Sequence, residues 1–138
     1  MFSTKNRCDL LSKPISSELY SYTNTILKNL DCVTYGIGGT NNHIHILCSL
    51  SKKHAMSDVI VKIKTGTSRW IKTKNEMFKN FYWQRGYGAF SISPSHKNII
   101  CNYIANQEQH HKQITFEDEL RKILKKYQTN YDEKYLLD

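Results

Sequence analysis

The chain has 138 residues, which suffices for one hydrophobic core, so we expect a single domain over residues 1–138. With 39% hydrophobic and 12% aromatic residues, the composition excludes a disordered protein, and no apolar stretch is long enough to cross a bilayer. The net charge of +8 favours an anionic partner over a membrane. Four widely spaced cysteines without a CxxC pair, and no signal peptide, predict reduced thiols in the cytoplasm.

The positive charge is concentrated in the middle of the chain. Residues 62–85 contain seven basic side chains against one acidic side chain, whereas residues 112–138 contain six of each. A basic patch on a folded domain is typical of phosphate binding. The solvated surface of an ordinary basic protein is the alternative explanation.

The first half of the chain predicts a strand, a helix, a hairpin and a second helix. A short strand is expected at residues 2–4, and apolar spacing predicts a helix over residues 15–30, with Ser16 and Ser17 as candidate caps. Two β-rich runs, residues 32–37 and 44–47, flank a Gly-Gly-Thr-Asn turn. An amphipathic helix follows over residues 56–71, with its basic residues off the apolar stripe.

The second half predicts a strand over residues 81–92, bent near its glycines, and then two helices. Ser93 and Pro94 favour a helix start, so one helix is expected over residues 94–111. Thr115 with Asp118 resembles a capping box for a terminal helix. The order predicts an α+β fold, namely a ferredoxin-like antiparallel sheet (β-α-β-β-α-β) with helices on one face, a tyrosine-bearing helix and a terminal helix.

Two histidines on one predicted strand are candidate metal ligands. His43 and His45 project from the same face, about 6 to 7 Å apart along the strand, because strand side chains alternate. Ile44 and Ile46 would anchor the opposite face in the core. Exposed histidines on a strand are also common, so the spacing alone leaves the assignment open.

Tyr103 and Gln107 are four residues apart, so on a helix they share one face and could reach one point together. A phenol has an ordinary pKa near 10 and needs a metal ion or a base to act as a nucleophile at neutral pH. Isoleucines flank the same stripe, and a core aromatic residue is the alternative explanation for Tyr103.

Taken together, these segments resemble a known family. Asn42-His43-Ile44-His45-Ile46-Leu47 is similar to the histidine-hydrophobe-histidine motif of the HUH endonuclease superfamily, and residues 103–107, Tyr-Ile-Ala-Asn-Gln, resemble its single-tyrosine transposase branch. Residues 2–7 and 83–91 are similar to the same branch, in the same order. One departure is that family chains usually carry a few more residues before the first strand.

The resemblance implies a transposase that acts on single-stranded DNA. His43, His45 and Gln107 would bind a divalent ion, Mg²⁺ or Mn²⁺, and Tyr103 would form a 5′-phosphotyrosine link and release a 3′-hydroxyl. A second 3′-hydroxyl could then reverse the step and join new partners. Family members bind hairpins at the ends of their elements and work as homodimers, in which the active sites can be composite.

Several basic and aromatic residues are candidates for DNA contacts. Tyr87 and Trp83 could stack on bases, although core packing is an equal alternative for Trp83. The candidates for phosphate contacts are Lys5, Arg7, Lys62, Arg69, Lys72 and Arg85.

Two other functions compete with a transposase. One is a non-catalytic relic or repressor that binds DNA hairpins but no longer cuts. The other is a structural zinc protein that uses His43, His45, Cys48 and further ligands. Tyr127, Tyr131 and Tyr135 are rival nucleophiles, but their spacing resembles a packing stripe on the terminal helix.

Overall fold

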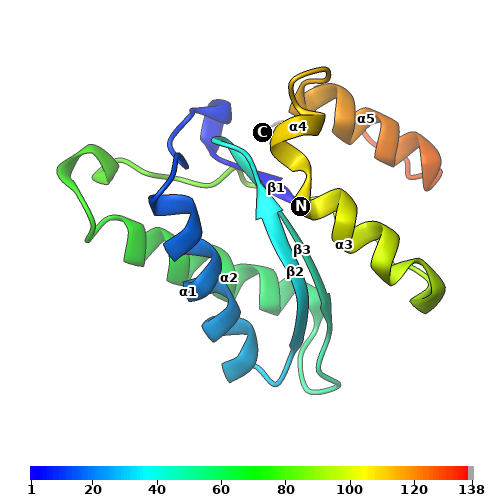
Figure 1. Ribbon diagram of the computed structural model, residues 1–138, viewed down its shortest axis with the longest axis horizontal. Helices are drawn as coiled ribbons and strands as arrows, with labels where there is room; N and C mark the ends of the chain where they lie inside the picture. The colour runs from blue at the N-terminus through cyan, green and yellow to red at the C-terminus, as the bar shows by residue number, and fades with distance from the viewer. Residues whose placement is uncertain (137–138) are drawn as a thin grey trace.

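The computed structural model describes residues 1–136. A small antiparallel sheet in the order β1-β3-β2 separates two groups of helices (Figure 1). Helices α1 and α2 lie on one side, and α3, α4 and α5 lie on the other. The strands and α-helices are β1 (Phe2–Ser3), α1 (Ile15–Asn29), β2 (Val33–Gly39), β3 (His43–Ser49), α2 (Met56–Ile71), α3 (Lys97–Ala105), α4 (Gln107–His110) and α5 (Phe116–Lys126). The short 3-10 helices are η1 (Lys5–Arg7), η2 (Glu76–Phe78) and η3 (Pro94–His96).

The predicted mixed fold, with its first helix, hairpin and second helix, is confirmed. Leu19 and Leu27 of α1 and Ile63 of α2 are buried against Ile44 of β3. Ile46 packs against the same core while staying partly exposed. The apolar face of the hairpin is therefore fixed by the core, which leaves the other face of β3 for α3, α4 and α5.

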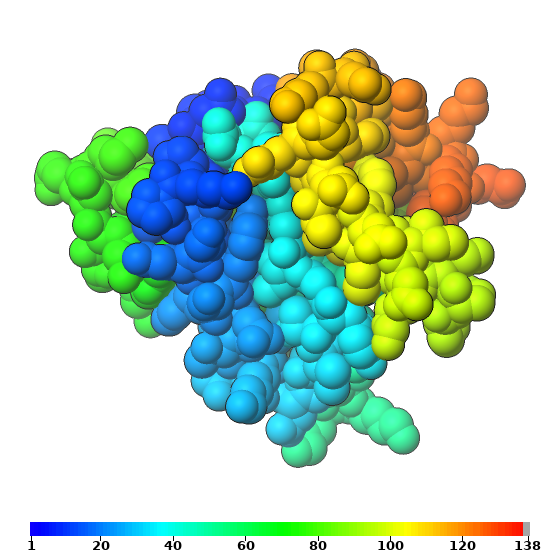
Figure 2. All heavy atoms as spheres, viewed as in Figure 1, coloured from blue at the N-terminus to red at the C-terminus, as the bar shows by residue number. Residues whose placement is uncertain are grey.

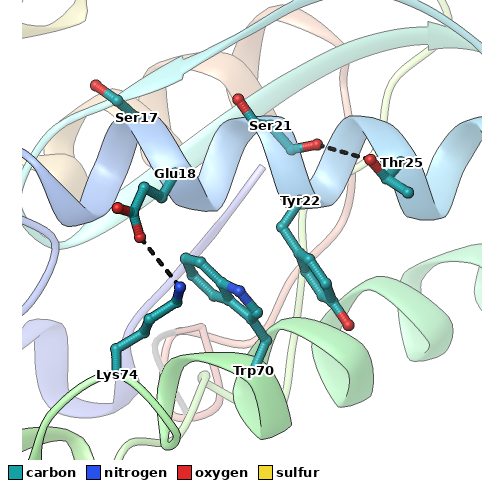
Figure 3. Close-up of a pocket in the computed structure, with 7 residues that line it drawn as sticks. All are labelled: Ser17, Glu18, Ser21, Tyr22, Thr25, Trp70 and Lys74. Atoms are coloured by element: carbon teal, nitrogen blue, oxygen red, sulfur yellow. Dashed lines mark hydrogen bonds and ion pairs between the residues drawn. The ribbon is translucent and has the colours of Figure 1, made fainter.

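The start of α1 differs from the prediction. Its N-cap is Pro14, which makes no side-chain capping bond, and Ser16 is buried inside the first turn. Further along, Tyr22 of α1 stacks on Trp70 of α2 with ring centroids 5.1 Å apart (Figure 3). The Lys74 ammonium lies over the Trp70 ring and 3.4 Å from a Glu18 oxygen, so polar groups also join the two helices at the surface.

The segment over residues 81–92 is not the regular strand that its sequence predicts. It runs beside β1, but only Thr4 and Trp83 form a β-bridge. The Ser3 amide donates to the side chain of Gln84, 2.6 Å away, instead of to a main-chain carbonyl. β1 has only two residues, and the Gln84 side chain replaces a main-chain carbonyl as the acceptor for one of them. Residues 81–92 therefore find too few main-chain partners for a longer ladder. The fourth strand of the ferredoxin-like pattern is thus reduced to a bridge.

The helix predicted over residues 94–111 is divided into η3, α3 and α4. The break lies at Asn106, whose side chain donates to the Asn102 carbonyl and whose φ of −102° and ψ of 20° leave the helical range. Asparagine favours such local bonds over a continuous helix. Gln107 therefore begins a new helical turn directly beside the sheet.

The terminal helix is capped as predicted but is shorter than expected. The Thr115 side chain accepts a hydrogen bond from the Asp118 amide. The helix ends at Lys126, and Gln128 has a φ of 51°. Tyr131 and Tyr135 lie beyond it and are exposed, so the predicted tyrosine packing stripe on this helix is wrong.

Helix α3 approaches β2 closely, and a glycine permits it. A Cβ atom at Gly38 would lie 2.4 Å from the Ile104 carbonyl oxygen. In Figure 2 the yellow atoms of α3 lie directly against the cyan atoms of β2. The close approach sets the height of the tyrosine-bearing helix above the sheet.

We predict that Gly38→Ala lowers the free energy of unfolding by about 1–3 kcal/mol, because backbone must shift to admit the methyl group. Gly36→Ala is the matched control, since its Cβ would meet only Cys101 Sγ at 3.9 Å. Urea unfolding measures both variants. Equal stabilities for the two would contradict the tight α3–β2 contact.

Candidate active site

The two predicted histidines lie on the same face of β3, as their spacing indicates. His43 is fully buried and His45 is 6% exposed, and their ring centroids are 5.3 Å apart. Pairing of Gly38 with His45 and of Gly39 with Ile44 fixes this register. The histidine face points toward the second helical group, opposite the apolar core.

Gln107 and Tyr103 meet these histidines, as the four-residue spacing predicts. Gln107 is buried, with its Oε1 atom 3.0 Å from His43 Nε2. The Tyr103 ring lies edge-on to His45 at 5.8 Å between centroids. All four side chains therefore come together within one chain. The core-aromatic alternative for Tyr103 is not what the structure has, because its hydroxyl faces polar groups.

Glu119, which the sequence motifs did not predict, lies at the centre of this cluster. It is 2% exposed, and its Oε1 atom is 3.0 Å from His45 Nε2 and 3.6 Å from His43 Nε2. Its Oε2 atom accepts hydrogen bonds from the Tyr103 hydroxyl and from the Gln107 amide. A signal was present in the sequence, since Glu119 shares the face of α5 that buries Phe116 and Leu120.

Two further histidines complete the cluster. His111 Nε2 lies 3.1 Å from Glu119 Oε1, and His110 Nε2 lies 3.3 Å from Glu119 Oε2. His110, His111 and Tyr103 are the partly exposed members, so the cluster meets solvent on their side. No sequence motif indicates His110 and His111, because they follow Gln107 at the end of a short helix whose direction depends on the break at Asn106.

Burial and mutual contacts shift the pKa values of the cluster. Burial, with a smaller effect from His45, lowers the pKa of His43 to about 3, and burial also lowers the pKa of His45. Burial raises the pKa of Tyr103, and the neighbouring Glu119 carboxylate raises it further. Burial alone would raise the pKa of Glu119, but contacts with His111, His45 and Tyr103 together outweigh it and lower the pKa. In the resting site His43 and His45 are therefore neutral beside the Glu119 carboxylate.

The donor pattern around His43 fits a bound cation. Its Nδ1 atom is 2.8 Å from Asn42 Oδ1, and its Nε2 atom is 3.0 Å from Gln107 Oε1. A neutral imidazole has one N–H group: with the proton on Nε2, Nδ1 can accept from the Thr40 hydroxyl 2.9 Å away, and with the proton on Nδ1, Nε2 turns a lone pair toward Gln107 Oε1. A metal ion beside Nε2 suits the second arrangement, because Nδ1–H can then donate to Asn42. His111 Nε2 is likewise buried and, although it lies 3.1 Å from Glu119 Oε1, forms no hydrogen bond among residues 1–136.

Histidine and glutamate alone make up the two groups that could hold a metal within the described part of the chain. They are His43, His45 and Glu119, and His110, His111 and Glu119. Neither group contains a cysteine, and Cys48 is free. The zinc alternative based on Cys48 therefore gains no support from the geometry. Nitrogen and oxygen ligands suit Mn²⁺, and oxygen ligands suit Mg²⁺.

The candidate DNA contacts fall in different surroundings. Lys5 and Lys72 both lie over the exposed ring of Tyr82, at 5.9 and 4.4 Å. Lys62, Arg69 and Arg85 are exposed. Arg7 instead pairs with Glu117 at 2.6 Å, which joins η1 to α5.

The aromatic candidates separate clearly. Trp83 is buried, and its indole N–H donates to Thr67 Oγ1 at 2.9 Å, so it has a structural role. Tyr87 is 40% exposed and lies under the Lys64 ammonium. Tyr87 is therefore the one of the two whose ring is open to a base.

Comparisons with known proteins identify the family. The family described as IS200-like transposases matches residues 1–107, and the chain therefore belongs to that family of DNA-processing enzymes. A crystal structure of a candidate transposase from Deinococcus radiodurans R1 has a similar fold, with 19% identity and a TM-score of 0.60. The match covers 77% of this chain and 85% of the other. The comparison with curated proteins gave no match.

We predict that protein stripped of divalent metal loses stability as the pH falls from 7 to 5.5. The unfolded chain takes up a proton on His43 near its ordinary pKa of 6.5, but the folded chain does so only near 3. Stability is therefore full above pH 6.5 and falls below it, by about 1 kcal/mol for this one group at pH 5.5.

Urea unfolding at the two pH values tests this coupling. His43→Asn should flatten the pH dependence, whereas His96→Asn, at an exposed histidine, should leave it unchanged. If His43→Asn shows the same pH dependence of unfolding as wild type, another titrating group causes that dependence.

Proposed function

We propose that this protein is a transposase that cuts and rejoins single-stranded DNA through Tyr103, with a divalent metal ion held by His43, His45 and Gln107. The observation that carries the proposal is that the Tyr103 ring lies against His45 of the buried histidine pair on β3, with Gln107 beside His43. A metal ion bound there, Mg²⁺ or Mn²⁺, supplies charge that polarises the scissile phosphate. The nucleophile and the acceptor of its proton are side chains of the protein itself.

Tyr103 is the nucleophile in this proposal. Its oxygen attacks phosphorus, a 5′-phosphotyrosine bond forms, and the bond to the 3′-oxygen breaks. The departing oxygen takes a proton from water and leaves as a 3′-hydroxyl. The phenol proton has an acceptor in the site, because the hydroxyl donates to Glu119. A phenol with a raised pKa is a poor nucleophile in the resting protein, which limits attack until phosphate and metal are present.

The basic surface would hold the DNA, in the form of hairpins at the ends of the element. Lys5 and Lys72 flank the exposed Tyr82 ring, which combines two phosphate-binding charges with a platform for a base. Lys62, Arg69 and Arg85 extend the charge, and Tyr87 offers a second exposed ring. Arg7 would contribute only by exchanging its contact with Glu117 for a phosphate.

The expected homodimer with composite active sites stays a prediction, as does action in the cytoplasm. In this chain Tyr103 lies beside the histidines of its own subunit, so an exchange between subunits would need the α3–α5 unit to leave the sheet. No helix in residues 1–136 combines the length and apolar character needed to cross a membrane. The four cysteines are free thiols.

A non-cutting hairpin binder derived from a transposase is the alternative function. It would need the same basic surface but not the Tyr103 hydroxyl. Cutting and holding can be separated, because Lys5 and Lys72 contact Tyr82, whereas Tyr103 contacts His45 and Glu119.

We predict that Tyr103→Phe eliminates cleavage of a single-stranded hairpin substrate with Mn²⁺ but leaves its affinity unchanged. The double variant Lys5→Ala with Lys72→Ala should bind the hairpin more weakly but still cut it at saturating protein. Its slope of log affinity against log salt should be flatter by about 2, or about 1 per lost phosphate contact. Gel shifts and cleavage assays on the same hairpin measure both effects. Wild-type protein that binds the hairpin but never cuts it would favour the relic.

A further inference from the structure

The two oxygens of Glu119 face different partners. Oε1 faces the histidine nitrogens of β3, and Oε2 faces the Tyr103 hydroxyl and the Gln107 amide. Glu119 belongs to α5, beyond the 1–107 segment that matches the family. The family match therefore gives this residue no role.

We propose that Glu119 is a ligand of the metal ion through Oε1 and the positioning residue of Tyr103 through Oε2. The inference rests on the metal-dependent cleavage proposed above. It makes the site a two-histidine, one-carboxylate centre in which Gln107 is an additional oxygen donor. One carboxylate would then join the metal ion to the nucleophile.

The distances suit a shared ion. Ligand atoms about 2.1 Å from an octahedral ion lie about 3 Å from their neighbours. Glu119 Oε1 is 3.0 Å from His45 Nε2 and 3.6 Å from His43 Nε2, and Gln107 Oε1 is 3.0 Å from His43 Nε2. The ligand atoms of His43, His45 and Glu119 all lie within 4.8 Å of one another, so these three can border one ion, and Gln107 Oε1 lies beside His43.

The chemistry also favours the carboxylate. Mg²⁺ and Mn²⁺ are hard cations, which bind charged carboxylate oxygens well. Two neutral imidazoles and a neutral amide leave the ion's charge uncompensated in a buried site, whereas Glu119 supplies one negative charge at 2% exposure. A purely structural role, as an acceptor for the surrounding histidines, is the competing explanation.

Mn²⁺ binding to the full-length protein without DNA separates the two explanations. Electron paramagnetic resonance titration of free Mn²⁺ should show affinity at least ~10-fold weaker for Glu119→Gln than for wild type. Glu119→Asp should recover part of the loss, because it restores the charge. Glu76→Gln makes the same change at an exposed position and should bind as wild type does.

The outcomes distinguish this inference from the proposed function. If His43→Ala loses Mn²⁺ but folded Glu119→Gln keeps wild-type affinity, the carboxylate is structural and the inference fails while the metal site stands. If His43→Ala also keeps wild-type affinity, the proposed metal site itself is wrong.

A second measurement uses the wild-type protein and does not depend on the variant folding. Anomalous scattering from Mn²⁺-soaked crystals should place the ion within bonding distance of His43, His45 and Glu119. An ion bound to His43, His45 and Gln107, with both Glu119 oxygens beyond ~3 Å, would overturn the inference.

Discussion

The Glu119 carboxylate is only 2% exposed. A buried carboxylate is stable in a folded protein only where hydrogen-bond donors surround it, and the rest of the site depends on this requirement. Removing a carboxylate from water costs several kcal/mol even after the protein relaxes. Glu119 meets His45 from β3, Tyr103 from α3 and Gln107 from α4. These contacts join α5 to the sheet and to the tyrosine-bearing helix, so the polar cluster also holds the second helical group in place.

The other requirement is a strand that is buried on both faces. In β3 the residue between the two histidines, Ile44, is fully buried in the core of α1 and α2. A shift of one residue in the register would turn the histidines into that apolar core and expose the isoleucine to the polar cluster. Gly38 lets α3 lie close to the neighbouring strand. The hairpin thus fixes the histidines, and the contact at Gly38 fixes the tyrosine above them.

Spacing predicted that His43 and His45 share a strand face and that Tyr103 and Gln107 share a helix face, but only the resemblance to the HUH superfamily joined the two pairs into one site. Local periodicity was also enough for the hairpin and for the helices of the first half. Glu119 lay out of reach because its role depends on how α5 folds back over the sheet. The strand predicted over residues 81–92 does not form, because a strand needs a pairing partner and β1 offers only two residues. The prediction of a tyrosine stripe on the terminal helix was wrong, because the helix ends at Lys126 and periodicity does not reveal where a helix ends.

The account depends most on Tyr103 being the residue that becomes linked to DNA. The direct measurement is to incubate the wild-type protein with Mn²⁺ and single strands from its own genomic flanks, digest the trapped adduct, and identify the modified peptide by mass spectrometry. The arrangement of Tyr103 beside His45 and Glu119 predicts a nucleotide on the peptide that contains Tyr103. An adduct on Tyr127, Tyr131 or Tyr135 would contradict the account.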